Sequence, residues 1–328
     1  MAATFPVASP FTTTPSYSGT FIPQLWSSKL NAKFYKATIF GEISNNNWEG
    51  EIKGMGDKIT INNIPSLTVS NYVAGTALTY EAPTPSVTTL QIDKGRYFAF
   101  QLNDVLAYQS QPKLMDVFSN DAAMQMKIAI DSTVIYNTFA SANASNKGAT
   151  AGALSGSYNL GTDDAPVTLT AANILATLTA LGGVLDEQNV PETDRYLVID
   201  PATRQLLMQS NLAQAQFMGD AQSMVRNGRI GSIDRFTVYV SNNLPKAIAG
   251  TNTPYLSGDG SENSVTSTGD VKRRVILAGH KSAISFASQM TKMETVRNPN
   301  DFGDYIRSLN VFGYAVVKDT SLAYAVVN

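Results

Sequence analysis

The sequence predicts an α+β fold in which one long helix joins two parts that contain β-sheets. Three observations carry this prediction. The stretch from Gln111 to Ala140 has no glycine and no proline after Pro112, and its apolar residues recur at three-, four- and seven-residue steps. Residues 48–104, before this stretch, alternate polar and apolar side chains with the period of β-strands. After it, strand and helix patterns first alternate, and strand-forming segments then follow one another to the end.

The composition is that of a globular chain with almost no net charge. Of the 328 residues 43% are hydrophobic, which suffices for real cores, and the net charge of -2 gives nucleic acid no long-range attraction. The absence of cysteine excludes disulfides, thiolate catalysis and cysteine-bound metals. The apolar runs are too short to span a membrane, and the N-terminus lacks a signal-peptide pattern, so we expect a soluble protein without a membrane partner. The charged fraction of 15% is low, which fits either a surface covered by partners or a neutral polar surface.

Residues 1–47 are expected to form an N-terminal arm followed by a short helix. The first 20 residues are rich in Pro, Thr and Ser and contain too little apolar area to order themselves. Trp26, Leu30 and Phe34 then fall on one helical face, and Lys29 and Lys33 on another. The first acidic residue is Glu42, so this face either lies near phosphate or is an ordinary solvated face.

Residues 48–104 are expected to form an extended β-hairpin loop that leads into the first sheet. Two readings stay open, a hairpin that lies across a neighbouring molecule and a small independent β domain. Turn signals separate five expected strands: Lys58–Asn62, Ser66–Ser70, Ala77–Tyr80, Thr89–Ile92 and Arg96–Leu102.

The long helix is expected to be amphipathic and about 45 Å long at ~1.5 Å per residue. Its charged residues, among them Asp121, Lys127 and Asp131, predict a solvated face. The opposite face is expected to cover a sheet with Leu114, Val117, Phe118, Met124, Ile128, Ile135 and Phe139.

Residues 105–164 comprise this helix and a following loop; the stretch 141–168 reads as flexible and without core residues. Residues 165–272 read as an α/β domain with a loop insertion at 247–270. Its expected elements are a helix from Thr170 to Gln188, a strand at Arg195–Ile199, a helix from Pro201 and a strand at Phe236–Val240. Residues 273–328 read as one closing sheet beneath the long helix, with strands at Arg274–Leu277, Ala283–Phe286, Lys292–Val296, Ile306–Val317 and Leu322–Val327.

The chain offers little for catalysis. His280 is the only histidine, and the glycine-rich, nucleophile-elbow and phosphate-loop motifs are missing. The pairs Asp163–Asp164 and Asp301 with Asp304 could hold calcium or act as acid and base, although such pairs commonly cap turns. We therefore expect no enzyme, no cofactor and no metal. Five aromatic residues could stack on bases, but few lysines lie near them, so we expect them to pack in a core: Trp26, Trp48, Tyr72, Tyr80 and Tyr97.

The order of these parts resembles the major capsid proteins of tailed bacteriophages, which share the Hong Kong 97-type fold. The resemblance rests on several short stretches: IPQLWSSKL (residues 22–30), GMGDKITI (54–61), Ile64–Pro65, Tyr72, LAGHKSAISFA (277–287) and VFGYAVV (311–317). It covers nearly the whole chain.

This resemblance implies a shell protein with an N-arm (1–47), an extended loop (48–104), a spine helix, an axial domain (165–272) and a peripheral domain completed by 273–328. Hundreds of copies would form hexamers and pentamers around the double-stranded DNA of a tailed phage, assembled in the host cytoplasm and found in the virion. Contacts with the packaged DNA would be nonspecific at most. Further partners would be a portal, a separate scaffolding protein and possibly a decoration protein, since the spine helix starts too early for an N-terminal scaffolding domain. The candidate assembly contacts are Trp26, Lys29, Lys33, Asp121 and Lys127.

Some members of this family join an extended-loop lysine to an asparagine of a neighbour. The span from Ile59 to Lys94 has no internal lysine, so we expect no such crosslink. Three alternatives stay open: an encapsulin-like cellular nanocompartment shell, a tail or surface-layer structural protein, and a hydrolase that uses the Asp pairs.

Overall fold

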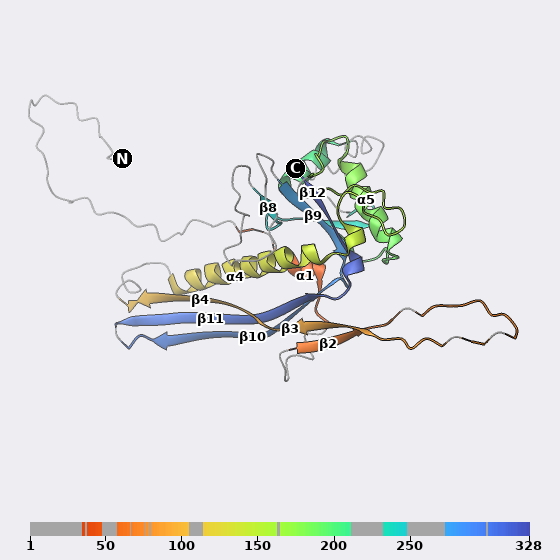
Figure 1. Ribbon diagram of the computed structural model, residues 1–328. Helices are drawn as coiled ribbons and strands as arrows, with labels where there is room; N and C mark the ends of the chain where they lie inside the picture. Colours follow the sequence, from red (N-terminus) through yellow and green to blue (C-terminus); the bar gives the residue numbers. More distant parts are fainter. Residues whose placement is uncertain are drawn as a thin grey trace, which may run out of the picture.

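The computed structural model describes residues 35–36, 38–47, 58–65, 67–75, 77–78, 80–104, 114–162, 165–210, 232–247, 273–299 and 301–328. Its longest helix separates two sheets, and a β-ribbon projects from the body (Figure 1). The elements up to this helix are α1 (Phe40–Ile43), β1 (Ser44–Asn45), β2 (Lys58–Asn63), β3 (Ser86–Gln91), β4 (Lys94–Asn103) and α4 (Leu114–Thr138). Those after it are α5 (Ile174–Glu187), β5 (Arg195–Ile199), α6 (Pro201–Gln209), β6 (Ser232–Ile233), β7 (Phe236–Val240), β8 (Lys246–Ala247), β9 (Arg273–His280), β10 (Ile284–Arg297), β11 (Gly303–Val316) and β12 (Leu322–Val327).

The predicted long helix is confirmed as α4, which has 25 residues and continues into a short 3-10 turn, Phe139–Ser141. Its expected beginning at Gln111 and Pro112 lies outside the described residues. At ~1.5 Å per residue α4 is roughly 37 Å long. It runs along β4, β10 and β11 (Figure 1).

A four-stranded sheet with the order β1-β10-β11-β4 lies against one side of α4. Arg96 on β4 donates from Nη2 to the Thr133 hydroxyl at 2.9 Å, and the rings of Phe100 and Phe118 meet edge to face at 6.0 Å. The even-numbered side chains of β4 thus face the helix, and the odd-numbered ones face away.

The expected strands at Ala283–Phe286 and Lys292–Val296 are one strand, β10, so their separation is wrong. Its register against β11 shifts between Ser288 and Met290. This irregularity moves the alternation by one residue, so the sequence pattern breaks in the middle of a continuous strand.

The second sheet has the order β12-β9-β5-β7-β6, with β8 also paired to β9. The parallel pair β5 and β7 confirms the predicted alternation of strand and helix. Because β9 and β12 join this sheet while β10 and β11 join the other, residues 273–328 do not form one closing sheet as expected. Strand pairing, which sequence periodicity does not specify, makes the difference.

Buried side chains alternate across β5 and place one core on each face of this sheet. Leu197 and Ile199 pack with the apolar faces of α5 and α6. Tyr196 and Val198 pack instead with the C-terminal half of α4. Two rings of the four-stranded sheet, Phe286 and Phe312, also enter the core below α4. The helix therefore joins both sheets through a shared core, whose α4 members are Ile130, Val134, Ile135 and Phe139 of the following turn.

The N-terminal half of α4 is different, because its apolar residues are only partly covered. Val117 is 38%, Phe118 43% and Met124 41% exposed, whereas Ile135 is fully buried. The expected continuous apolar face is therefore confirmed for the C-terminal half only.

The expectation that residues 141–168 are flexible and carry no core is wrong for the described part. Ala151 and Leu160 are fully buried, and Ala151 pairs with Tyr158 in a β-bridge. The Asn146 amide donates to the carbonyl oxygens of Thr320 at 2.7 Å and Leu322 at 2.9 Å. Asp163 and Asp164 lie outside the described residues.

The β-ribbon contains only two of the five strands expected in residues 48–104. β2 and β3 pair antiparallel, and β4 leaves them to pair with β11. The described residues within 66–70 and 77–80 form no strand, so these two predictions are wrong there. An isolated ribbon has no neighbour to complete longer pairing at this distance from the body.

Candidate assembly surfaces

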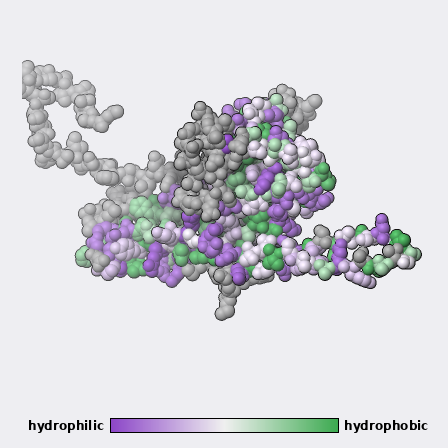
Figure 2. All heavy atoms as spheres, in the orientation of Figure 1, coloured by the Kyte–Doolittle hydropathy of each residue, from purple (hydrophilic) through white to green (hydrophobic). Residues whose placement is uncertain are grey.

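The loop between β2 and β3, residues 64–85, is rich in exposed apolar side chains. We call this loop the arm, as distinct from the N-terminal arm of residues 1–47. Ile64 is 97%, Val69 96% and Tyr80 90% exposed, and Leu67, Tyr72, Val73 and Leu78 are also exposed. The arm projects from the rest of the described chain, and hydrophobic residues lie along it and at its tip (Figure 2). Exposed apolar side chains in this number mark a contact site with another molecule.

Glu81 joins the two sides of the arm. Its carboxylate accepts a hydrogen bond from the backbone N–H of Thr68 at 3.1 Å. Thr68 holds the pKa of Glu81 below its usual value, because the bond favours the charged form. The arm is thus held together locally although its described tip forms no strand.

The base of the arm is clamped on the face of the four-stranded sheet that points away from α4. Leu90 is fully buried here. Gly313 makes the clamp possible, because a Cβ at this position would lie 2.1 Å from the Gln91 carbonyl oxygen and 2.9 Å from the Ile92 Cα. The direction of the arm therefore depends on a backbone crossing that only glycine permits. The small core of the clamp comprises Ile61, Leu90, Ile92 and Ala287, with Ile59, Val311, Ala315 and Val317 packed around it.

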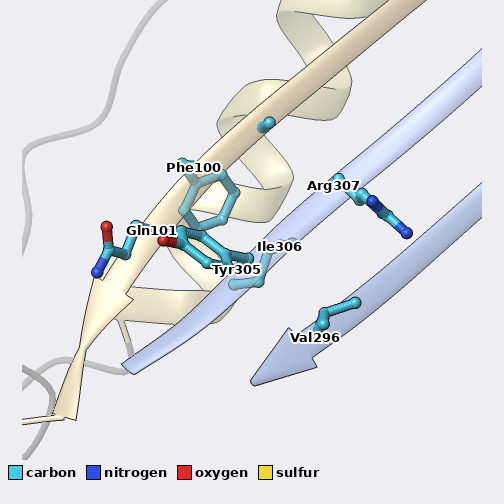
Figure 3. A pocket seen from close by; sticks show the side chains of 7 residues that line it. Phe100, Gln101, Val296, Tyr305, Ile306 and Arg307 are labelled. Carbon is cyan, nitrogen blue, oxygen red and sulfur yellow. The ribbon is translucent and has the colours of Figure 1, made fainter. Parts of the chain in front are cut away.

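The outer half of the same sheet face is left open. A hollow of about 360 Å³ lies there. Figure 3 shows it with α4 behind the strands. Strand register arranges the open face in three rows across β4, β11 and β10: Tyr97, Leu309 and Lys292; Ala99, Arg307 and Glu294; Gln101, Tyr305 and Val296. Tyr72, Tyr80 and Tyr97 lie exposed on the arm and this face, so the expectation that they pack in a core is wrong.

Charges on this face pair with one another. Glu294 accepts from Lys292 and from Arg307 Nη2, the latter at 2.7 Å. These partners hold the pKa of Glu294 below its usual value, Lys292 contributing most. At the far end of the sheet Arg297 pairs with Asp104 and, at 3.3 Å, with Asp304. Exposed pairs of this kind orient a surface more than they stabilise it.

Asp131 is the residue that sequence reasoning placed wrongly, because it is fully buried rather than on a solvated face. One carboxylate oxygen accepts from the backbone N–H groups of Ile39 at 2.9 Å and Phe40 at 2.7 Å. The other accepts from Asn243 Nδ2 at 2.6 Å. Burial raises the pKa of Asp131 even though these three bonds favour its charged form. Asp131 thereby fastens α1, α4 and the segment after β7 to one another.

The predicted assembly residues have different positions. Trp26, Lys29 and Lys33 lie outside the described residues. Asp121 accepts a hydrogen bond from the Tyr35 hydroxyl at 2.9 Å, so it contacts its own chain. Lys127 is exposed on α4.

The described residues contain no group of three His, Asp or Glu side chains that could hold a metal. His280 lies at the end of β9 with its Nδ1 2.7 Å from the Ser282 hydroxyl, and desolvation lowers its pKa. Of the predicted Asp pair, Asp304 is bound to Arg297 and Asp301 accepts from Asn103 at 3.4 Å. None of the described helices is long and apolar enough to cross a membrane.

Solved phage capsids share this arrangement. A chain of Mycobacterium phage Che8 is 23% identical, with 95% of this chain and 98% of that chain covered and a TM-score of 0.71. The capsid of cyanophage P-SCSP1u gives 17% identity, coverages of 94% and 93%, and a TM-score of 0.68. The mature capsid of bacteriophage PhiM1 is 14% identical, with 99% of this chain and 98% of that chain covered and a TM-score of 0.66. At these identities the likeness shows the fold, which is the predicted Hong Kong 97-type fold.

The sequence itself identifies the family. No curated protein matches it significantly. A family model described as phage capsid protein matches residues 84–326, from the end of the arm to the last strand. This match favours a capsid shell over a nanocompartment, a tail protein or an enzyme. The chain therefore belongs to the phage capsid protein family and is a structural subunit of the major capsid type.

Proposed function

We propose that this major capsid protein forms hexamers and pentamers, and that hundreds of copies close into the icosahedral head around double-stranded DNA. The observation that carries the proposal is the arm, which presents exposed Ile64, Val69 and Tyr80 far from the cores of its own subunit. Such side chains require cover from another molecule, and in a shell of identical subunits that molecule is the adjacent copy.

The arm lies over the neighbouring subunit in this proposal. Covering one large apolar side chain contributes about 1.5–3 kcal/mol, so a single arm supplies a modest gain. Each subunit gives one arm and receives another, and a closed shell adds these contacts together. The noncovalent contact replaces a lysine crosslink, since no lysine lies between Lys58 and Lys94.

The test removes apolar area from the arm without touching the body. Val69→Ser with Tyr80→Ser should leave the far-UV circular dichroism and melting temperature of the unassembled subunit unchanged and abolish closed particles in electron microscopy. The matched control, Asn71→Ser with Thr84→Ser, changes exposed polar residues of the same arm and should assemble normally. Closed, uniform particles from the Val69 and Tyr80 variant contradict the proposal.

Finer assignments follow from the family resemblance. We propose residues 1–47 as the N-arm, 48–104 as the extended loop, 105–164 as the spine helix with its following loop, 165–272 as the axial domain and 273–328 as part of the peripheral domain. Strand pairing favours moving β9 and β12 to the axial domain. A portal, a separate scaffolding protein and a decoration protein are proposed partners, DNA contacts are nonspecific, and assembly takes place in the host cytoplasm.

Trp26, Lys29, Lys33, Asp121 and Lys127 are the proposed assembly contacts. Lys127 is the cleanest to test because its side chain is exposed on α4. Lys127→Glu should change particle yield or shape and leave the unfolding free energy within about 0.5 kcal/mol of the wild type. Unaltered particles would remove Lys127 from the proposal.

A further inference from the structure

The exposed apolar residues of α4 surround one particular anchor. Val117, Phe118 and Met124 lie four and three residues before and three residues after Asp121, so all three share its side of the helix. Asp121 holds the hydroxyl of Tyr35 at 2.9 Å. We call Val117, Phe118 and Met124 the spine patch. The described part of the N-terminal segment therefore starts at the centre of this patch.

Two contacts give the direction of the chain along α4. Ile39 and Phe40 bind Asp131, and Tyr35 binds Asp121, ten residues nearer the N-terminus of the helix. Ten helical residues rise about 15 Å. Four or five extended residues span about the same distance. The segment from Tyr35 to Phe40 thus runs along α4 in the same direction as the helix, as in a parallel pair.

The sequence before Tyr35 suits the spine patch. Trp26, Leu30 and Phe34 recur every four residues, the spacing of one helical face. At ~1.5 Å per residue, Leu30 would lie about 7 Å before Tyr35, level with Val117. The charges of residues 22–34 are also complementary to those of α4. Lys29 and Lys33 are the only charged residues from 22 to 34, and the acidic Asp116 and Asp121 lie at this end of α4.

We propose that residues 22–34 form a helix that packs on the spine patch of the same chain, parallel to α4. Trp26, Leu30 and Phe34 cover the patch, and the Tyr35–Asp121 hydrogen bond sets their register. The occupant is the chain's own segment rather than that of a second copy, because Tyr35 and Phe40, which directly follow this segment, are already bound to α4. The inference concerns the single subunit and does not depend on shell formation. It assigns Trp26, Lys29, Lys33 and Asp121 to contacts within one chain, in place of the assembly contacts proposed above.

The absence of cysteine allows a direct test by disulfide formation in the full chain. Cysteines whose Cα atoms lie within about 7 Å can form a disulfide. Leu30→Cys with Val117→Cys should convert most of the oxidised protein to a faster-migrating monomer band on a nonreducing gel. The control pair, Leu30→Cys with Ala123→Cys, keeps an exposed position on the other side of α4 and should remain largely unlinked.

A mixing experiment separates the two possible donors. Equal amounts of Leu30→Cys and Val117→Cys single variants should give no linked dimer beyond the background of each variant alone. Efficient linked dimers, or equal linking of the Val117 and Ala123 pairs, overturn the proposal.

Tryptophan fluorescence gives a second readout without crosslinking. Trp26 and Trp48 are the only tryptophans, so Trp48→Phe leaves Trp26 as the sole emitter. Adding Val117→Asp should shift its emission to longer wavelength, because a carboxylate in the patch displaces the apolar side chain into water. Adding Ala123→Asp should leave the emission wavelength of Trp26 unchanged. Identical spectra for both variants contradict the docking.

Discussion

Gly313→Ala should misdirect the arm without unfolding the subunit. The added Cβ would lie 2.1 Å from the Gln91 carbonyl oxygen and 2.8 Å from the Gln91 carbonyl carbon. These are backbone atoms, so a rotamer change cannot relieve the overlap, and the ribbon must move outward by roughly 1 Å to restore ordinary contact. Overpacking of this size costs about 1–3 kcal/mol, and it falls on the clamp core around Leu90 rather than on the two larger cores.

Hydrogen exchange and electron microscopy together test this reasoning. Amides of β2 and β3 should lose protection in Gly313→Ala while those of β5 and β9 keep it, and closed particles should become rare. Gly95→Ala is the matched control, because Gly95 lies in the same sheet and its added Cβ would meet only Leu309 Cδ1 at 3.8 Å. Equal protection and equal particle yield in the two variants would refute the role of the clamp.

Three further predictions follow from the helix and the arm. Ile135→Ala should lower the unfolding free energy by about 2–5 kcal/mol in urea titrations, and Ile128→Ala by clearly less, because Ile135 is fully buried and Ile128 only half-buried. Burial raises the pKa of Asp131, so its contribution to stability is full below the unfolded pKa and is lost as pH rises through the folded pKa. The penalty of Asp131→Asn should therefore grow as pH falls from about 7 to about 4; a shrinking penalty contradicts the sign. Boiled mature particles should run on a denaturing gel as the single chain, and a ladder of higher bands would show a crosslink that the lysine-free span Ile59–Asp93 makes unexpected.

Features set by local chemistry were predictable from the sequence. The Asp200 carboxylate accepts from the N–H groups of Ala202 and Thr203, and Pro201 occupies the first turn, so α6 begins where its sequence indicates. α4 likewise follows from a run without helix breakers. The sequence also predicted a β-hairpin within residues 48–104, although its length in regular strands was overestimated.

Features set by distant partners were not predictable. Asp131 reads as a solvated charge within the helix, and only the approach of Ile39, Phe40 and Asn243 makes its burial possible. Residues 141–162 read as a flexible linker because their side chains are small and polar. Their order comes from bonds such as those of Asn146 to Thr320 and Leu322, which lie more than 170 residues away. Sequence periodicity carries no information on such contacts.

The two halves of α4 therefore have different roles. Its C-terminal half binds both sheets through buried Val134 and Ile135, and with Asp131 it fixes the subunit core. Its N-terminal half also carries apolar residues, but Phe118 and Met124 there are partly exposed. An exposed apolar surface of this kind marks a contact site. The proposed docking of residues 22–34 provides that contact from the same chain, so the N-terminal half of α4 binds the N-terminal segment while the C-terminal half binds the two sheets.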